Sequence, residues 1–416
     1  MEKKYTILET FVGAGGAHLG FKNEGFVSKY ANDIELSTLE TLLLNNPEIS
    51  DTAFIDHRDI LKIKGEEILE NTNLLPGEAD VFFSGIVCKG FSLAGQRSPN
   101  DERNYFYHKQ LELINIVRPK ISIIENVPGI INAQVLDQNT PKEIKEKVDS
   151  LWLKIEQYNG LKAELRKKNM ITEEINDQGK ALHKERKELL EEITKGKYLI
   201  SVIDDIKSLY KKIGYKVQMK KLNSSWYGSY TKRERIIIVA VRDDIDIEFE
   251  YPKRTHIKPR TVNDALSKID YTLEDEDNKP MNHKPKTVER FKYIPEGKNI
   301  VDVMDQVPKE LKISSYYSRG STMRLAGDEP SPTLVPGHSN FPVHPREHRS
   351  ITVREAATIT GFPLDYKFIG SHTKRCEHVG NAVPIHLAEA LARSCKKLLD
   401  LYYKDILSIE TFKKAR

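Results

Sequence analysis

Four short apolar runs, separated by amphipathic stretches, occupy the first third of the chain. Between Tyr5 and Ile124 they read YTILETF, VSKYAND, ADVFFSG and KISIIEN. This alternation is typical of strand and helix units that build a doubly wound, mostly parallel α/β sheet. The runs end at loops that carry Gly, Asp, Cys or Glu. Because ligands of open α/β sheets bind outside the carboxyl ends of the strands, we expect the chemistry of the protein at these loops.

The rest of the chain departs from this alternation in two places. Residues 135–197 combine apolar positions at helical spacing with dense charges of both signs, which predicts a solvated helical hairpin inserted into the first domain. A clamp on DNA or a dock for a partner is the alternative, but mixed charge on exposed helices usually serves solubility. Residues 243–349 contain many Pro and Gly and predict a second, irregular domain. A last helical run, IHLAEALARSCKKLLDLYYKDI, is expected to close the first domain.

Composition narrows the class of protein. The 416 residues carry 65 Lys and Arg against 61 Asp and Glu, and this formal charge of +4 permits a polyanionic partner without requiring one. No run approaches the ~20 apolar residues of a membrane span, and the N-terminus lacks a secretory pattern, so we expect a cytoplasmic protein without membrane contact. The three cysteines, Cys88, Cys376 and Cys395, form no CxxC pair, which fits a reduced compartment. No metal site is expected.

The glycine loop FVGAGG, Phe11 to Gly16, follows the first predicted strand. Glycines there let backbone N–H groups approach a nucleotide or a carboxylate. The loop lacks the G-x-G-x-x-G pattern of dinucleotide enzymes, but Asp33 ends the next strand, where an acid can hold ribose hydroxyls. This combination favours a nucleoside-bearing cofactor over a purely structural turn. Asp59 and Ile60, after a short third strand, suit an adenine, although Asp59 could equally cap a helix.

Three further segments carry side chains suited to covalent and acid–base chemistry. Cys88 lies in a glycine-flanked loop beside Lys89, where a thiolate would be exposed and stabilised; an inert buried thiol is the commoner fate of a lone cysteine. Glu125 ends a buried strand and is a candidate acid or hydrogen-bond donor, or else a cap or turn residue. Arg233 and Arg235 project to one face and suit a phosphate or base carbonyl, although such a pair alone is more often surface charge.

These pieces, in this order, resemble the DNA cytosine-5 methyltransferases over nearly the whole chain. FVGAGG is similar to the family's first motif, GIVCKGFSLAG to its catalytic Cys loop, ENVPG to its Glu motif and RER to its Arg motif. TVREAATITGFP (352–363) and VGNAVP (379–384) resemble its last two motifs. The resemblance implies an S-adenosylmethionine-dependent methyltransferase fold with a smaller, irregular target-recognition domain. The expected division is a catalytic domain at 1–242 with the helical insert 135–197, target recognition at 243–369, and a segment at 370–416 that returns to the catalytic domain.

The resemblance also implies a role for each candidate residue. Cys88 would attack C6 of the target cytosine and make C5 nucleophilic toward the methyl group of S-adenosyl-L-methionine. Glu125 would hold the N3 edge of the base, and Arg235, with Arg233 nearby, would contact the base carbonyl and the sugar-phosphate. Elimination of the thiolate, after loss of the C5 proton, would release 5-methylcytosine. The positions that match the cofactor pocket are Phe11, Gly13, Ala14, Gly15, Gly16, Asp33, Ile34, Asp59, Ile60, Phe106, Asn381 and Val383.

Double-stranded DNA is the implied partner, and the target base must be rotated out of the stack before C6 can be attacked. The candidates for closing over the flipped base are Ser92, Ala94, Gly95, Gln96 and Arg97, and those for reading bases in the major groove are His338, Asn340, Arg346 and Arg349. Any one recognition residue could equally belong to a loop packed for stability. The implied setting is bacterial restriction–modification with a monomeric enzyme. The sequence leaves open whether a cognate restriction endonuclease that shares its site accompanies it.

The chain departs from the family pattern at three positions. Val87 stands where Pro usually precedes the cysteine, Lys89 where Gln usually follows it, and Thr231 where Gln usually opens the Arg motif. We expect the Pro to Val change to affect the rate more than the chemistry, because it alters loop stiffness and a cofactor contact. One rival function is tRNA methylation by a branch of the same fold, but the short signature of that branch after the Arg motif is absent. The other rival is a non-catalytic DNA-binding regulator, which would be expected to lack the Cys or the Glu.

Overall fold

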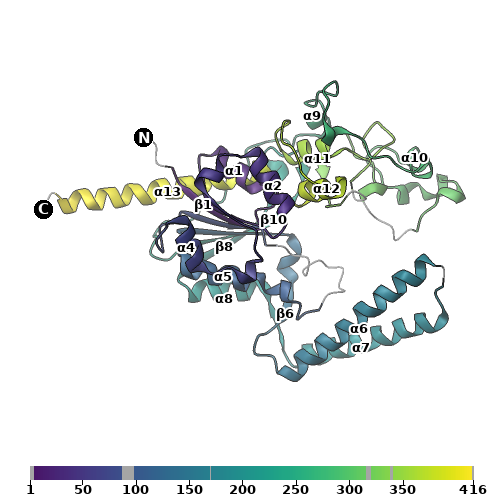
Figure 1. Ribbon diagram of the computed structural model, residues 1–416, viewed down its shortest axis with the longest axis horizontal. Helices are drawn as coiled ribbons and strands as arrows, with labels where there is room; N and C mark the ends of the chain where they lie inside the picture. The colour runs from purple at the N-terminus through teal and green to yellow at the C-terminus, as the bar shows by residue number, and fades with distance from the viewer. Residues whose placement is uncertain (1–3, 87–97, 169, 315–319, 338–340, 415–416) are drawn as a thin grey trace. The chain divides into compact units, whose positions relative to one another are not determined.

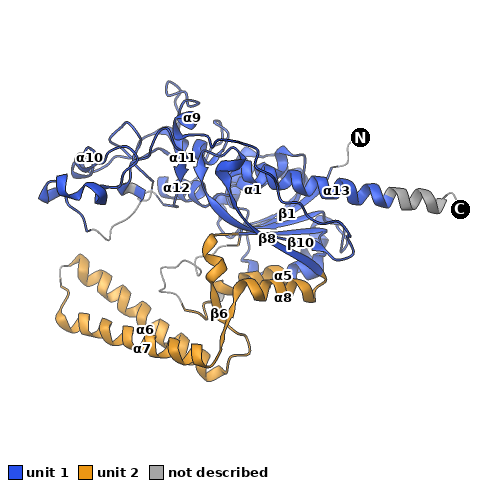
Figure 2. Cartoon of the chain, turned by 180° about the vertical axis from the view of Figure 1, so that it is seen from behind, with its two compact units in different colours: residues 1–85, 112–125, 215–416 blue, residues 86–111, 126–214 orange. Residues whose placement is uncertain are grey.

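The computed structural model describes residues 4–86, 98–168, 170–314, 320–337 and 341–414, with the backbone alone for residues 102, 321 and 407–414. The chain divides into two compact units (Figure 2). Unit 1 comprises residues 1–85, 112–125 and 215–416, and unit 2 comprises residues 86–111 and 126–214. Unit 1 therefore contains both the predicted catalytic sheet and the predicted recognition region.

A seven-stranded sheet forms the centre of unit 1, with the strand order β3-β2-β1-β4-β5-β10-β8 (Figure 1). β1 pairs in parallel with β2 and β4, β2 with β3 and β4 with β5, whereas β8 is antiparallel to β10. The mostly parallel α/β fold predicted from the alternating runs is confirmed. The order reverses between β1 and β4, so a ligand crevice is expected at their carboxyl ends. The strands are β1 Thr6–Thr10, β2 Val27–Asn32, β3 Phe54–Asp56, β4 Val81–Ser84, β5 Ile121–Asn126, β8 Tyr215–Asn223 and β10 Glu234–Arg242.

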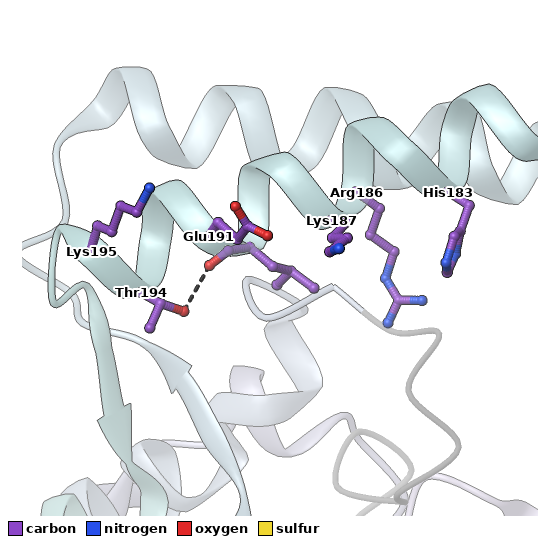
Figure 3. A pocket seen from close by; sticks show the side chains of 7 residues that line it. His183, Arg186, Lys187, Glu191, Thr194 and Lys195 are labelled. Atoms are coloured by element: carbon purple, nitrogen blue, oxygen red, sulfur yellow. Dashed lines mark hydrogen bonds between the residues drawn. The ribbon is translucent and has the colours of Figure 1, made fainter.

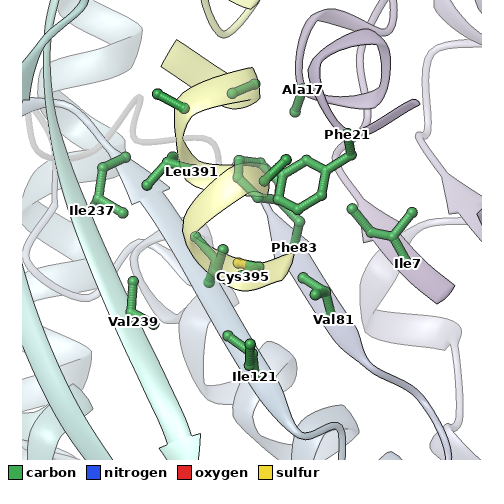
Figure 4. Packing of buried hydrophobic residues seen from close by; sticks show 14 of the residues in the cluster. Ile7, Ala17, Phe21, Val81, Phe83, Ile121, Ile237, Val239, Leu391 and Cys395 are labelled. Atoms are coloured by element: carbon green, nitrogen blue, oxygen red, sulfur yellow. The ribbon is translucent and has the colours of Figure 1, made fainter. Parts of the chain in front are cut away.

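Helices α1 (Gly16–Asn23) and α13 (Ile385–Lys414) contribute to the main hydrophobic core on one face of this sheet (Figure 4). Because side chains alternate along a strand, Val81 and Phe83 of β4 point to the same face, where they meet Phe21 of α1 and Leu391 of α13. A Cβ on Gly20 would collide with the backbone of α13 at Ala388 and Glu389, so glycine allows the two helices to approach closely. The end of the chain is thereby packed against its beginning.

The other helices of unit 1 are short, and those after β10 belong mainly to an irregular region. A two-stranded parallel pair, β9 (Thr231–Lys232) with β11 (Ser331–Pro332), joins this region to the start of β10. The region has its own small core around Phe291, Ile300 and Val343. The helices are α2 Leu36–Asn45, α3 Ile49–Thr52, α4 Gly65–Thr72, α9 Val262–Leu266, α10 Pro285–Phe291, α11 Val353–Thr360 and α12 His372–Asn381, with 3-10 turns η1 Ile60–Lys62, η4 Ser224–Tyr227, η5 Glu276–Asn278, η6 Ile300–Gln306, η7 Lys309–Leu311 and η8 Gly320–Thr322.

Unit 2 carries a long antiparallel pair of helices in the segment predicted as a helical insert. An apolar seam that includes Val148, Trp152, Leu189 and Ile193 joins them. Thr172 caps α7 through its side chain, which accepts from the N–H of Ile175, a local signal that fixes where this helix begins. The elements are α6 Lys142–Lys167, α7 Glu173–Lys195, α8 Val202–Lys212, the strand pair β6 Gln134–Leu136 and β7 Leu199–Ser201, and the 3-10 turns η2 Glu102–Tyr105 and η3 Pro128–Asn132; α5 Phe106–Val117 runs from unit 2 into unit 1.

An open pocket lies along α7 (Figure 3). Its described lining residues come from α7 alone and are mostly charged: His183, Arg186, Lys187, Leu190, Glu191, Thr194 and Lys195. None of these is a predicted site residue. Within the described part of the chain, no helix has the length and apolar character needed to cross a membrane.

Candidate active site

The glycine loop leaves β1 in a conformation that depends on glycine. Gly13 and Gly15 have φ of +57° and +87°, in the left-handed region that glycine adopts without strain. A Cβ on Gly15 would lie 2.6 Å from Cδ1 of Leu42 and 2.9 Å from the hydroxyl of Tyr366. Above Gly13, by contrast, the space is open to 4 Å. The loop is thus packed tightly at Gly15 and left accessible at Gly13, as a loop that receives a ligand on its backbone would be.

The C-terminal segment completes this loop, as the sequence predicts. A Cβ on Gly16 would collide with the carbonyl oxygen of Val383. Val383 is buried and Asn381, the last residue of α12, is exposed. The Tyr366 hydroxyl donates to the carbonyl of Ala14 at 2.7 Å and so fixes the loop from a second distant segment. Two parts of the chain far from the glycine loop therefore determine its position.

Asp33 connects the loop after β2 with the glycine loop. Its Oδ2 accepts from the N–H of Gly13 at 2.9 Å and its Oδ1 from the N–H of Glu35 at 3.0 Å. Burial raises the pKa of Asp33. Ile34 next to it is 65% exposed, which is unusual for isoleucine and leaves an apolar face open beside the carboxylate. A carboxylate oxygen has more than one lone pair, so Asp33 can accept from a ligand hydroxyl as well.

Asp59 fulfils the helix-cap role that the sequence left open, whereas Ile60, predicted to pack on an adenine, is buried. The Asp59 side chain caps η1 by accepting from the N–H of Leu61 at 3.0 Å. Ile60 is 3% exposed and belongs to the buried side chains. The helix-cap alternative is therefore present in the structure. A contact of Asp59 with a nucleoside would use its remaining acceptor capacity.

Glu125 and Arg235 meet at the edge where β5 ends and β10 begins. Oε1 of Glu125 lies 2.7 Å from Nε of Arg235, and both residues are only 7% exposed. The contact is an ion pair, and Oε1 has no hydrogen-bond partner among the described residues. Arg235 also donates from Nη1 to the carbonyl of Glu234 at 2.7 Å. The pair presents a buried carboxylate with a free acceptor site, held in place by a guanidinium.

The ends of three adjacent strands thus carry the candidate chemistry. The glycine loop follows β1 and Glu125 lies near the end of β5; the segment to Cys88 follows β4, between them. Thr10 and Ser84, at the ends of β1 and β4, share a hydrogen bond of 2.9 Å that fixes these two ends together. Cys88 itself lies outside the described residues.

Comparison with known proteins identifies the family. The model of the C-5 cytosine-specific DNA methylase family matches residues 5–165 and 171–397. This chain belongs to that family. The methyltransferase is 28% identical to the type II methyltransferase M.PspPI of a Psychrobacter strain over 97% of this chain and 82% of the relative. It is also 27% identical to M.Eco47II of Escherichia coli, over 95% and 80% of the two chains.

Solved structures support the fold. A prophage-encoded chain of Escherichia coli, assigned as a DNA modification methyltransferase, superimposes with a TM-score of 0.64 at 21% identity and covers 95% of this chain and 100% of its own. The Dnmt2 methyltransferase of S. pombe superimposes with a TM-score of 0.54 at 13% identity, over 95% and 100% of the two chains. The methyltransferase is thus a DNA cytosine-5 methyltransferase on a methyltransferase α/β fold.

Arg233 is placed differently from the prediction that it contacts the base. Its side chain is buried, and its Nη1 donates to the carbonyls of Gly380 at 2.7 Å and Leu334 at 3.4 Å. Its Nη2 donates to the carbonyl of Asn381 at 3.2 Å. Both terminal nitrogens of the guanidinium therefore bind backbone carbonyls, and the side chain is only 5% exposed. Arg233 holds the segment before Val383 in the methyltransferase and is a positioning residue.

Arg349 also departs from its predicted role in base recognition. Its guanidinium forms a two-point contact with the fully buried carboxylate of Glu355, with distances of 2.8 Å from Nη1 and Nη2, and it pairs with Glu347 at 2.8 Å. Its donors are therefore engaged within the protein. Arg346 is exposed and stays a candidate for DNA contact.

Phe106, most of the predicted DNA contacts and the three departures from the family pattern remain to be placed. Phe106 is half-buried at the start of α5 in unit 2, whereas the glycine loop belongs to unit 1. The other predicted DNA contacts of the methyltransferase lie outside the described residues: Ser92, Ala94, Gly95, Gln96, Arg97, His338 and Asn340. Val87 and Lys89 lie there too. Thr231 lies in β9, where its hydroxyl donates to the carbonyl of Pro332 at 3.1 Å.

Sequence reasoning missed two residues that shape the site. Tyr366 holds the glycine loop, and no motif spacing pointed to it. Glu355 closes a capping box with Thr352 at the start of α11 and also binds Arg349. The T-x-x-E spacing of residues 352–355 is a recognised helix-start signal and could have been used to predict that Glu355 points inward.

Proposed function

We propose that this methyltransferase modifies C5 of a cytosine rotated out of duplex DNA, with S-adenosyl-L-methionine as methyl donor and Cys88 as covalent nucleophile. It would serve as the modification enzyme of a type II restriction–modification system, as the names of its relatives suggest. The observation that carries the proposal is the buried Glu125–Arg235 pair at the sheet edge, with an unfilled acceptor oxygen on Glu125. The proposed domains are 1–242, 243–369 and 370–416, and the enzyme would act as a monomer in the cytoplasm.

The cofactor residues fit a nucleoside-bearing donor. Open space at Gly13, the carboxylate of Asp33 and the exposed face of Ile34 offer backbone approach, a hydroxyl acceptor and an apolar surface. Phe11, Gly15, Gly16, Asp59, Asn381 and Val383 would complete the site. When bound, S-adenosylmethionine supplies an electrophilic methyl group. The contribution of the protein is to orient the nucleoside and to keep the loop after β1 rigid through Tyr366 and Val383.

The catalytic residues act on the base. The Cys88 thiolate would add to C6, which shifts electron density toward C5 and N3. The free Oε1 of Glu125 can take up a proton, and the carboxyl group would then donate it to N3, where charge develops. Arg235 would orient Glu125 and contact the base carbonyl. Once C5 carries the methyl group, loss of its proton to a base or water would restore the 5,6 double bond and allow the thiolate to leave. A few kcal/mol of unstacking accompany flipping and would be offset by contacts to phosphates and groove edges.

The test is base-resolution conversion sequencing of DNA from a methylation-free host that expresses the chain. Protected cytosines in one short sequence context are expected, and Cys88→Ala should abolish them. Glu125→Gln preserves shape and should slow methylation by ~10²-fold or more, the usual scale of acid–base contributions. Unprotected DNA with the intact chain would refute the proposal. A restriction endonuclease encoded beside the gene should fail to cleave the protected DNA.

A further inference from the structure

A basic surface lies at residues 253–268 of unit 1, apart from the candidate active-site residues. This segment carries five Lys or Arg and a single Asp. We define the basic patch as Lys253, Arg254, Lys258, Arg260 and Lys268. All but Arg260, which is half-buried, are exposed.

Aromatic rings hold the patch in place. The guanidinium of Arg254 lies 4.3 Å from the ring centroid of Trp226. Arg260 and Lys268 lie 5.6 and 5.3 Å from the centroid of Tyr230. The backbone N–H of Thr255 donates to the carbonyl of Trp226 at 3.0 Å, which fixes the segment itself. A cation over a ring keeps its N–H donors available for an anion.

The acids beside the patch neutralise only part of its positive charge. Within the described part of the chain, none of the five patch residues forms an ion pair, whereas Arg58, Arg242 and Arg354 each do. Asp264, the acid of this segment, accepts from the N–H of Thr261 in a capping box. Hydrogen bonds from Thr261, followed by the charges of Arg260 and Lys258, lower the pKa of Asp264. Burial, followed by the charges of Arg260 and Lys268, lowers the pKa of the neighbouring His386 to about 4. The patch is therefore a region of positive potential.

Tyr230 connects part of the patch to the strand that carries Arg235. It contacts two of the patch cations and precedes Arg235 by five residues. Five extended residues span at most about 18 Å, so the Tyr230 backbone lies within this distance of the Arg235 backbone.

We propose that the basic patch binds the phosphate backbone of duplex DNA beside the target site. Arg254 and Arg260 can each contact a phosphate with two parallel N–H donors, and the lysines act as point charges. These contacts carry no sequence information and would add affinity to any duplex long enough to reach them. The inference rests on the proposed function, with duplex DNA as the substrate.

The test compares a triple variant, Arg254→Gln, Lys258→Gln and Lys268→Gln, with a control of equal charge, Lys64→Gln, Lys211→Gln and Lys404→Gln, which are exposed lysines on α-helical or loop surfaces elsewhere. Arg260 is left intact because it also contacts the Tyr230 hydroxyl. Binding of the full chain to a fluorescent mixed-sequence duplex of about 40 base pairs is measured over a range of salt concentrations.

Each phosphate contact contributes about 0.9 to the slope of log affinity against log salt, so the patch variant should lose about 2 to 3 units of slope. The control variant should keep the slope of the parent. Equal slopes for the patch variant and the control would overturn the inference. Methylation of unmethylated genomic DNA by the parent chain is measured in parallel: its absence would refute the proposed function, while the binding slopes would still decide the role of the patch.

Discussion

Replacement of Arg233 by Met tests whether this residue positions the segment before Val383 or acts on the target base. The change leaves the carbonyls of Gly380 and Asn381, and the weaker acceptor of Leu334, without their buried donor. Hydrogen bonds to a charged group contribute about 1.5–3 kcal/mol each. Burial lowers the pKa of Arg233, which shows that the charged guanidinium is costly in this position. Its removal therefore offsets part of the free energy lost with the hydrogen bonds. We expect Arg233→Met to lower the free energy of unfolding by about 2 to 4 kcal/mol.

The functional consequence should appear in cofactor binding. Arg233 fixes the carbonyls of Gly380 and Asn381, just before Val383, which contacts Gly16 in the glycine loop. A loosened segment should weaken the affinity for S-adenosylmethionine by ~10-fold, equivalent to about 1.4 kcal/mol. The rate at saturating cofactor should stay within about three-fold of the parent, because Cys88, Glu125 and Arg235 are unchanged.

The assays are urea unfolding, calorimetric cofactor binding and single-turnover methylation at saturating cofactor. Arg393→Met is the control, since Arg393 forms an exposed ion pair with Glu24 and such pairs contribute about 0–1 kcal/mol. A fall of ~100-fold or more in the single-turnover rate, with normal cofactor affinity and normal unfolding, would refute the positioning role. It would instead show that Arg233 acts on the base.

Three further results are expected. Gly16→Ala should abolish cofactor binding measured by calorimetry, because its Cβ would collide with the backbone of Val383. Tyr366→Phe removes the hydrogen bond to Ala14 and should cost about 0.5–1.5 kcal/mol in urea unfolding and weaken cofactor binding several-fold; unchanged values in both would contradict the role of Tyr366. Burial lowers the pKa of His378 to about 4, so the unfolded state binds more protons between about pH 4 and 6.5, and stability should fall with acidification across this window by up to about 3 kcal/mol. In His378→Gln this part of the pH dependence should disappear.

The sequence predicted the catalytic sheet because its signals are local. A strand buried in a parallel sheet needs a continuous apolar run, and the loops after such strands carry the ligand-binding residues. Residues such as Gly13, Asp33 and Glu125 can therefore be assigned to strand ends from the apolar runs that precede them. The order of the motifs then indicated the family, which the family comparison confirms.

The same local signals could not predict the role of a side chain whose hydrogen-bond partner lies elsewhere in the chain. Arg349 looks like a DNA contact in a polar loop, but Glu355 takes its donors. For Asp59 the sequence allowed a contact with a nucleoside or a helix cap, and the structure shows the cap, in which Asp59 accepts from the N–H of Leu61. In each case the residue type allows both outcomes, and the partner decides between them.

Arg233 and Arg235 show most clearly what each level determines. By itself, the sequence contains two arginines of equal chemistry, two positions apart, and predicts that both face one site. The tertiary structure separates them, since the carbonyls at Leu334, Gly380 and Asn381 enclose one guanidinium, while the other pairs with Glu125. Local sequence determines which elements form, because helix and strand periodicity depend on near neighbours. The burial and partners of a side chain depend on segments far along the chain, so only the packed fold decides which arginine binds backbone carbonyls and which one pairs with Glu125.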